Sequence, residues 1–490
     1  MPDTAITVPV FGFGVGTKSP NVSAQMRENL YIEKPDDPDK TPIALYARPG
    51  LNNFTNEIGG TVRGAIANPT FAEGDAVVFC IAAAGVVPSV TQRYLADGAG
   101  DGLAGAGTIQ TSEGPVRAAQ LGTQSLFVDG VSGYIYDFDL NDVTDLTTLP
   151  SAADFPYGTK SVTACASRII AVDPAELGRF RWSNAGDPTT WDALDFATAE
   201  SSPDVLTAVF EASGQLLLFG SQTIEFWAPS ASGASGLQAF SRVGGANIQW
   251  GTTSIDTIRK CNDSVCFLGR TGGGNLQVVQ LRGYEAQVIS TPDVEYDIAQ
   301  DPTTGSATAI FAVTTGHAFY IINLSTHSWV YDFRNGTWGK WTTGGSRFAG
   351  QWSMSAFGKL IISDYRDGRI YTLDPETLTD DGEVIVREVI SKHGWANLAR
   401  LSLRELAIDC QTGVGINDGQ GDDPQIMLQW SKDGGHTWGN EVWQSLGAMG
   451  NYLTRTVWRN LGRSRDWLFK LRVTDPVKTV IIGAAAIFKP

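Results

Sequence analysis

Charged residues, and basic residues above all, are scarce in this sequence. Only 18% of its 490 residues are Asp, Glu, Lys or Arg, and 36 basic residues face 52 acidic ones, so the formal net charge is −16. Proteins that grip nucleic acid use clustered Lys and Arg, which release counterions from the phosphates. The balance therefore argues against a DNA-gripping protein, although an acidic surface suits a conduit through which DNA slides.

Residues that hold metal ions are equally rare. The four histidines lie far apart, at His317, His327, His393 and His436. We expect them on the surface or in turns, because they lack metal-site spacing. Of the five cysteines only Cys261 and Cys266 are close together, and no CxxC pair occurs. We read them as small buried side chains in a reduced compartment and predict neither a metal ion nor a cofactor.

Long apolar runs and enzymatic signatures are missing too. No stretch reaches the roughly 18 apolar residues of a membrane span, and the first 20 residues lack the layout of a secretory signal, so we expect synthesis and initial residence in the cytoplasm. The sequence has no G-x-S-x-G elbow and no phosphate-binding G-x-x-x-x-G-K-[ST] loop. No pair of carboxylates stands out for glycoside hydrolysis. We predict a protein without catalytic residues.

Glycine and tryptophan, by contrast, are plentiful. The 55 glycines and 14 tryptophans favour many short strands joined by tight turns. The clearest unit starts at Val116 and contains four apolar runs, VRAAQL, SLFVDG, YIYDFD and VTDLTTL, separated by turn residues. About seven such units lie between Val62 and Ile390, with six as the alternative count. A period of roughly 40–50 residues with four strands per unit is typical of a β-propeller.

The expected fold is therefore all-β. We predict an extended N-terminal arm at residues 1–60, a β-propeller at 61–395 and a separate C-terminal β-sandwich at 396–490, where the strand pattern changes. The arm contains a polar loop at residues 35–40. A sandwich or a set of unrelated β domains is the alternative to the propeller.

One motif in the C-terminal region matches the Asp-box pattern S-x-D-G-G-x-T-W. We interpret it as a structural hairpin turn, in which the aspartate accepts backbone hydrogen bonds, the glycines take positive φ and the tryptophan anchors the turn. Its residues are Ser431, Asp433, Gly434, Gly435, Thr437 and Trp438. Asp boxes are familiar in sialidases, which are propellers, so a propeller glycosidase is the rival reading. The box occurs only once here.

A late segment, VWRNLGRSRDWLFKLRV, interleaves basic and aromatic residues. Arg and Trp are favoured in contact hot spots, so the segment is a candidate contact patch for DNA or a partner protein. A strand with a charged outer face explains it equally well. The patch consists of Trp458, Arg459, Arg463, Arg465, Trp467 and Arg472.

The order and spacing of several segments resemble a known family. These are NLYIEK and RPGL in the arm, SSPDVLTAVFEASGQLLLFGSQTIEFW from Ser201, LQWSKDGGHTWGNEVW, and TRTVWRNLGRSRDWLFKLRVTDPV near the end. Together they resemble the packaged-DNA stabilisation protein, or tail nozzle, of short-tailed bacteriophages of the P22-like group. The likeness extends over nearly the full length.

The resemblance implies a structural virion protein in the tail, assembled in the host cytoplasm. It implies a ring of six copies below the portal and adaptor, closed by a tail tip or needle, which retains packaged double-stranded DNA and conducts it during ejection. Tailspikes or fibres are further candidate partners. A glycan-binding or receptor-binding propeller is the second rival, after the glycosidase.

Overall fold

The secondary structure is almost entirely β. The computed structural model describes residues 5–8, 14, 19–34, 43–55, 60–68, 76–82, 92–94, 100–101, 109–199, 204–230, 239–395 and 399–489. The polar loop predicted at residues 35–40 lies outside them. Within the described residues the helices are α1 (Pro292–Gln300) and the short 3-10 helices η1 (Leu146–Thr148), η2 (Pro150–Ala152), η4 (Ile255–Thr257) and η5 (Thr304–Ser306).

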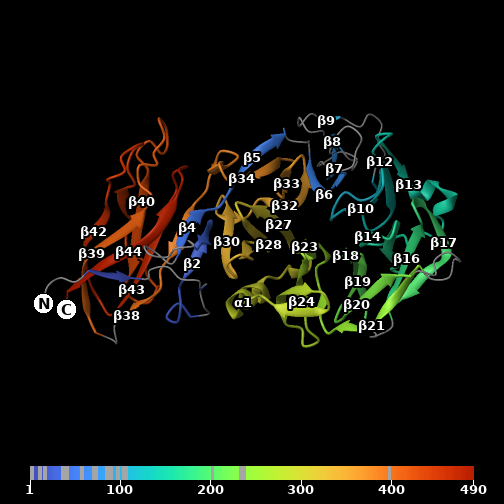
Figure 1. Cartoon of the computed structure of the whole chain (residues 1–490), viewed down its shortest axis with the longest axis horizontal. Coiled ribbons are helices and arrows are strands. Elements are labelled where there is room, and N and C mark those ends of the chain that lie inside the picture. The colour runs from blue at the N-terminus through green and yellow to red at the C-terminus, as the bar shows by residue number, and fades with distance from the viewer. Residues whose placement is uncertain are drawn as a thin grey trace.

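Seven propeller blades surround one axis in the described part of the chain; six of them are separate sheets, and blade six is one end of a larger sheet (Figure 1). Blade one consists of β6 (Thr61–Asn68), β7 (Ala76–Ala82), β8 (Gln92–Tyr94) and β9 (Gly100–Asp101). Blade two consists of β10 (Arg117–Leu121), β11 (Gln124–Val128), β12 (Gly133–Asp137) and β13 (Asp142–Asp145). Blade three consists of β14 (Val162–Cys165), β15 (Arg168–Val172), β16 (Arg179–Asn184) and β17 (Asp187–Thr198). Blade four consists of β18 (Leu206–Ala212), β19 (Gln215–Gly220), β20 (Ile224–Pro229) and β21 (Phe240–Ile248).

The remaining blades complete the circle. Blade five holds β22 (Gly251–Thr252), β23 (Arg259–Cys261), β24 (Ser264–Arg270), β25 (Leu276–Arg282) and β26 (Glu285–Val288). Blade six holds β27 (Thr308–Thr314), β28 (His317–Asn323), β29 (Ser328–Asp332), β30 (Thr337–Thr343) and the short β31 (Ser346–Arg347). Blade seven holds β32 (Gly350–Ala356), β33 (Lys359–Asp364), β34 (Ile370–Asp374), β5 (Gly50–Thr55), β35 (Thr379–Asp380) and β36 (Glu383–Val384). Because β32 contacts β6, the last blade meets the first.

The second strands of the blades show why the sheets stack. In β19 the side chains of Leu216 and Leu218 pack into a cluster shared with blade three, whereas Leu217 and Phe219 pack into a cluster shared with blade five. All four are at most 2% exposed. Successive residues of a strand point to opposite faces, so an unbroken apolar run lets one strand bury both faces of its sheet. Each full burial contributes about 1.5–3 kcal/mol.

Tight turns set the spacing between the first and second strands. Ser213 and Gly214 have φ of 54° and 77° and join β18 to β19 in a two-residue hairpin. Thr315 and Gly316, with φ of 49° and 78°, do the same between β27 and β28. Two consecutive positive φ values define the hairpin turn that matches strand twist. The glycines noted in the sequence therefore serve this repeated geometry.

A β-sandwich lies beside the propeller, at the left of Figure 1. Its first sheet contains β3 (Leu30–Glu33), β4 (Ala44–Ala47), β44 (Val480–Lys489), β39 (Leu401–Cys410) and β42 (Thr456–Ser464), with β1 (Ala5–Val8) paired to β44. Its second sheet contains β2 (Met26–Glu28), β37 (Arg387–Ile390), β43 (Asp466–Val473), β40 (Gln425–Ser431) and β41 (Val442–Ser445), with β38 (Gly394–Trp395) paired to β43. Leu30, Leu406 and Trp467 belong to the core between them.

The N-terminal segment joins the two domains. Strand β2 pairs with β37 on one side and in parallel with β30 on the other, so one sheet runs from blade six into the sandwich. Strand β5 pairs with β34 and supplies a strand of blade seven. The predicted all-β propeller with a C-terminal sandwich is confirmed, with seven blades. The predicted division at residues 60 and 395 stays a prediction.

A buried ion pair fixes this joint. Arg48, the first residue of the RPGL segment, donates two hydrogen bonds to Asp380, from Nη1 to Oδ1 at 2.9 Å and from Nη2 to Oδ2 at 2.5 Å. The two side chains are 0% and 3% exposed. The guanidinium also lies 5.6 Å from the centre of the Trp341 ring. A paired, hydrogen-bonded charge is tolerated in such a site, whereas an unpaired one is not.

Candidate functional site

The centre of the propeller is a cavity lined by all seven blades. Its volume is about 770 Å³, and one residue from each blade in turn is Thr61, Arg117, Lys160, Thr207, Asp256, Thr308 and Gln351. Ligand pockets form preferentially where structural elements converge, so this cavity is a candidate reaction site. Its charged groups therefore show whether the chain has a reaction site there.

An ion pair crosses this cavity. Arg117 of blade two donates from Nε to Asp256 Oδ1 at 2.8 Å and from Nη2 to Oδ2 at 2.7 Å, although Asp256 lies in η4 of blade five. Its Nη1 also donates to the carbonyl of Lys160 in blade three, at 2.8 Å. Bidentate Arg–carboxylate pairs are among the strongest and most directional polar contacts. The pair ties three blades together across the axis and obstructs the centre.

The buried carboxylates of the cavity are engaged in structure. Burial raises the pKa of Asp129, but hydrogen bonds from the backbone of Ser132 and Val131 and from Thr111 outweigh it, so that its pKa is lowered. Asp256 is the acceptor of the Arg117 pair. A glycosidase needs a carboxylic acid that stays protonated to act as general acid. Asp129, whose pKa is lowered, does not have that character.

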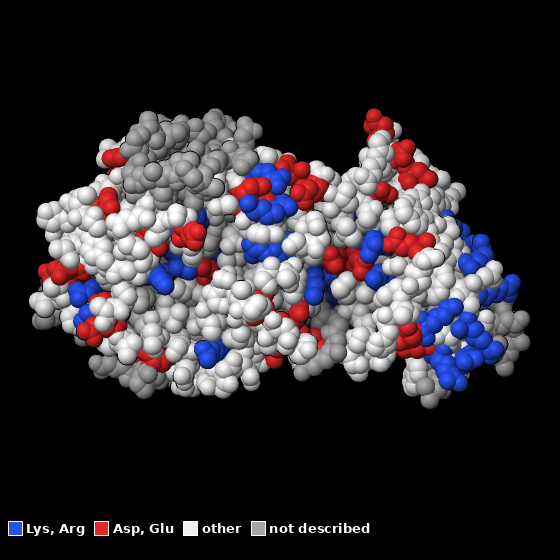
Figure 2. Space-filling model, turned by 180° about the vertical axis from the view of Figure 1, so that it is seen from behind, with Lys and Arg blue, Asp and Glu red and all other residues white. Residues whose placement is uncertain are grey.

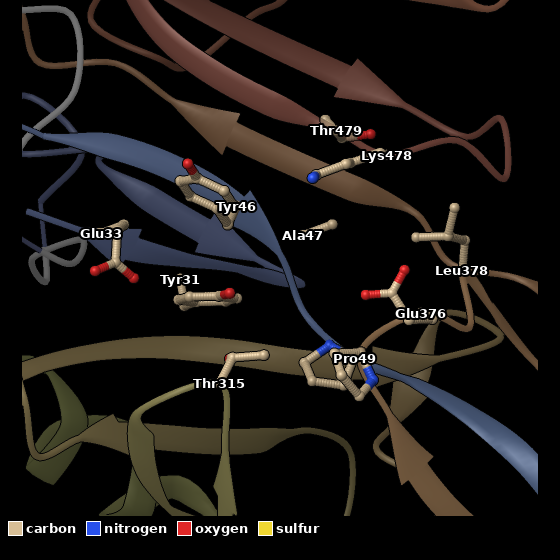
Figure 3. Close-up of a pocket in the computed structure, with 11 residues that line it drawn as sticks. Tyr31, Glu33, Tyr46, Ala47, Pro49, Thr315, Glu376, Leu378, Lys478 and Thr479 are labelled. Atoms are coloured by element: carbon tan, nitrogen blue, oxygen red, sulfur yellow. The ribbon is translucent and has the colours of Figure 1, made fainter. Parts of the chain in front are cut away.

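A second pocket lies at the joint between the domains (Figure 3). Its volume is about 400 Å³, and Tyr31 and Tyr46 form one wall with ring centres 6.0 Å apart. Glu376 and Lys478 lie on the opposite side, on the loops next to β34 and β44. The N-terminal segment supplies Tyr31, Glu33, Tyr46, Ala47 and Pro49 of the lining, and any group bound there would contact both domains.

His317 stands behind this pocket and connects β28 to β3. Its Nδ1 lies 2.9 Å from Asp332 Oδ2 and its Nε2 lies 2.6 Å from Glu33 Oε2. Burial lowers the pKa of His317, but the hydrogen bonds to Asp332 and Glu33 outweigh it, so the pKa is raised above its ordinary value. We expected this histidine on the surface or in a turn. It is instead 1% exposed, because two carboxylates distant in sequence surround it.

The Asp-box residues form the turn after β40. The Thr437 N–H and hydroxyl donate to Asp433 at 2.9 and 2.6 Å, and the Gly435 N–H donates to Ser431 Oγ at 2.9 Å. Hydrogen bonds from Thr437 and Ser431 lower the pKa of Asp433. Gly434 and Gly435 have φ of 74° and 96°. Lys470 Nζ lies 4.6 Å from the Trp438 ring centre, which places that ring against β43.

The residues of the candidate contact patch separate into two groups. Trp458 and Trp467 are 3% and 0% exposed and belong to the sandwich core, so their indoles are not part of any surface. Arg459 and Arg463 lie exposed on β42, and Arg465 lies exposed just after that strand. Arg472 is bound to Glu388 and Glu441 at 2.7 and 2.8 Å. The alternation along the strand directs the aromatic rings inward and the arginines outward.

Metal-ligand clusters and disulfides are absent from the described residues. There, no group of three His, Cys, Asp or Glu could hold a metal ion, and the described cysteines Cys165, Cys261, Cys266 and Cys410 are free. Burial raises the pKa of Cys165 to about 11, which makes its thiol inert. No helix among those residues is long and apolar enough to cross a membrane.

Two protein-family models match this chain, one in each domain. A family model described as "Bacteriophage P22 Gp10, beta-propeller" matches residues 82–378, and one described as "Bacteriophage P22 Gp10, beta-sandwich" matches residues 386–488. No curated protein matches the chain.

Similar solved structures are distant. An exo-β-1,3-galactanase from Phanerochaete chrysosporium with galactose is 10% identical, covers 76% of this chain and 95% of its own, and has a TM-score of 0.27. The N-terminal domain of Nup159 is 8% identical, covers 71% and 98%, and has a TM-score of 0.39. Likenesses this distant carry no argument about function.

A closed seven-bladed propeller, obstructed at its axis and joined by a shared sheet to a sandwich, places the chain among two-domain β-propeller proteins. Both family matches are more specific. The chain belongs to the bacteriophage P22 Gp10 family of phage tail and DNA-stabilisation proteins, and it is a structural protein of phage particles. The family predicted from the sequence is thereby confirmed.

Proposed function

We propose that the chain is a non-enzymatic wall subunit of the tail nozzle. In this proposal six copies, assembled in the host cytoplasm, form a ring below the portal and adaptor. Their common bore carries the double-stranded DNA outward, and a tail tip or needle closes the bore until infection. The sequences of the two domains support it through their family matches.

The obstructed propeller axis is the observation that carries this proposal. Arg117 and Asp256 bridge blades two and five with bonds of 2.7 and 2.8 Å. A DNA duplex has a major groove that alone is about 12 Å wide, so it cannot pass a channel that two side chains span. The DNA path must therefore run between subunits, which requires several copies around it.

The sheet that the two domains share supports the role of a rigid wall subunit. The sheet that begins in blade six passes through β30, β2 and β37 into the sandwich, and Arg48 pairs with Asp380 beside it. Backbone hydrogen bonds across such a joint resist hinge motion more than a flexible linker does. A subunit of this kind keeps its shape under the pressure of packaged DNA.

The net charge suits passage without adhesion. Six copies with a formal charge of −16 each present the duplex with a like-charged environment. Screening limits this repulsion to about 8 Å at physiological salt, which is enough to keep phosphates from settling on the wall. DNA that does not bind the wall leaves quickly once the tip opens.

A deletion experiment tests the proposal. Phage particles produced without this chain are expected to package DNA and then lose it, and cryo-electron microscopy of complete tails is expected to show the chain as a ring around the axial channel. Tails that lack the chain, or particles that hold their DNA without it, would contradict the nozzle function. Release of sugars from host polysaccharide by the purified chain would contradict the non-enzymatic role.

A further inference from the structure

The outer face of the first sandwich sheet carries a group of exposed cations. Arg404 lies on β39, Arg459 and Arg463 lie on β42, and Arg465 and Lys432 lie beside the end of β42, all of them exposed. We call these five residues the cationic face. Figure 2 shows the Lys and Arg side chains gathered over the sandwich end of the molecule.

Strand register explains why these cations share one side. Glu405 is opposite Arg459 and Ser402 is opposite Arg463, and directly opposed residues point to the same face of a sheet. Arg404 falls in the bulge between Leu403 and Glu405, which turns it outward as well. Glu405 offsets one of these charges through a 3.1 Å contact with the Arg459 Nε, and that arginine is still 65% exposed.

Apolar side chains lie next to the cationic face. Ala407 pairs with Ala485, and Ile487 is opposite Glu405, so these small and apolar side chains lie on the same outer face, beside the arginines of β39 and β42. All three are partly exposed in the single chain. Apolar side chains next to charged ones are typical of a protein interface, whereas DNA-binding faces consist mainly of cations and polar groups.

A complementary surface lies at the opposite end of the molecule. Residues 137–145, around the β12–β13 turn of blade two, contain four Asp and no Lys or Arg. Asp139 and Asp142 are exposed, and Leu140 between them is 75% exposed. On the neighbouring outer strand β17, Leu194 is 82% exposed beside Asp192. We call the surface around Asp139, Leu140, Asp142 and Leu194 the acidic rim.

We propose that the cationic face of one copy docks on the acidic rim of the next copy in the ring. The two surfaces have opposite charge, each includes exposed apolar side chains, and they lie at opposite ends of the long axis, near β42 and β13 in Figure 1. A patch that binds a different patch on an identical subunit gives a head-to-tail contact, which closes into a ring when the rotation permits. The inference rests on the proposed ring function.

Charge reversal tests the pairing of the two surfaces. The variants are Arg459→Glu/Arg463→Glu on the face, Asp139→Lys/Asp142→Lys on the rim, and the combination of all four. Lys260→Glu/Lys359→Glu is the matched control, because both lysines are exposed in other blades and the net charge changes as in the face variant. Each chain is supplied in cells infected by phage that lack the gene, and the copies of the chain per purified particle are measured.

Each single-surface variant is expected to lower the incorporation of the chain about tenfold or more, because like charges would then meet. The combined variant is expected to restore it to within about twofold of wild type, which a folding defect cannot explain. Wild-type incorporation of either single-surface variant, or no rescue by the combination, overturns the inference. Loss of incorporation in the control does so too.

The remaining outcomes separate this inference from the proposed function and from DNA binding. If the wild-type chain is absent from tails, the nozzle function fails whatever the variants do. If all variants assemble normally, the nozzle function stands and the docking inference fails. If purified wild-type chain retards duplex DNA in a gel and the face variant neither retards it nor loses incorporation, the cationic face binds DNA and the inference is overturned.

Discussion

Replacement of Asp380 by asparagine is the sharpest test of how the joint is held together. Asp380→Asn keeps the shape of the side chain but removes its charge, which leaves the Arg48 guanidinium, 0% exposed, without a counter-ion. Removal of one partner from a buried pair typically costs about 3–5 kcal/mol. With an unfolding entropy of about 2.1 cal/mol/K per residue over 490 residues, that cost lowers the melting temperature by about 3–5 °C.

The neighbouring residue supplies a matched control. Asp381 pairs with Arg369 at 3.3 Å, and these side chains are 25% and 28% exposed, so Asp381→Asn is expected to cost about 1 kcal/mol or less. Differential scanning calorimetry measures both variants under identical conditions. Replacing both members of the buried pair, as Arg48→Leu/Asp380→Leu, is expected to recover most of the loss, since apolar pairs often substitute for buried ion pairs. Equal melting temperatures for Asp380→Asn and Asp381→Asn would refute the reasoning.

Three further predictions concern the other contacts. Because the folded-state pKa of His317 is raised, its contacts with Glu33 and Asp332 stabilise fully below about pH 6.5 and less as the pH rises through that raised pKa. The melting-temperature gap between wild type and His317→Gln should therefore narrow as the pH rises above about 6.5 and through the raised pKa, and a gap that widens would contradict this sign. Gly50→Ala places a Cβ against the carbonyl oxygens of Thr377 and Thr379, so limited proteolysis should cut blade seven sooner than in wild type, and unchanged digestion would argue against the close packing of β5. Asp433→Ala removes the acceptor of both Thr437 bonds, so hydrogen exchange should speed up in the Asp-box turn and stay unchanged in β43; faster exchange in β43 would show a wider structural role.

The repeat architecture was readable from the sequence because it depends on local patterns. Runs such as Leu216 to Phe219 bury both faces of a strand, and the two-residue turn at Ser213 and Gly214 has positive φ. Each blade can therefore be recognised from a segment of about 45 residues. The sequence of β42 also showed that basic and aromatic side chains are interleaved, but it did not show which of them face the core. The sequence could not tell that Trp458 faces the core, since both faces of that strand carry large side chains.

The contacts that hold the joint were beyond local reasoning. Arg48 and Asp380 are 332 residues apart, and His317 and Glu33 are 284 residues apart. No periodicity links such positions, because each pair forms only after the fold has brought distant strands together. A single polar residue at the head of the apolar strand HAFYIIN was the one signal for His317. The pairing of β5 with β34 was hidden for the same reason.

The pairing of β5 with β34 also sets the order of events during synthesis and folding. Thr55 is made 315 positions before its partner Ile370. At about 5–20 residues per second, the nascent strand waits roughly 15–60 s with an open edge. Strand edges left open invite wrong partners, including strands of other nascent chains. The propeller can be completed only after Ile370 has been made, so premature termination anywhere before Ile370 leaves the ring of blades open.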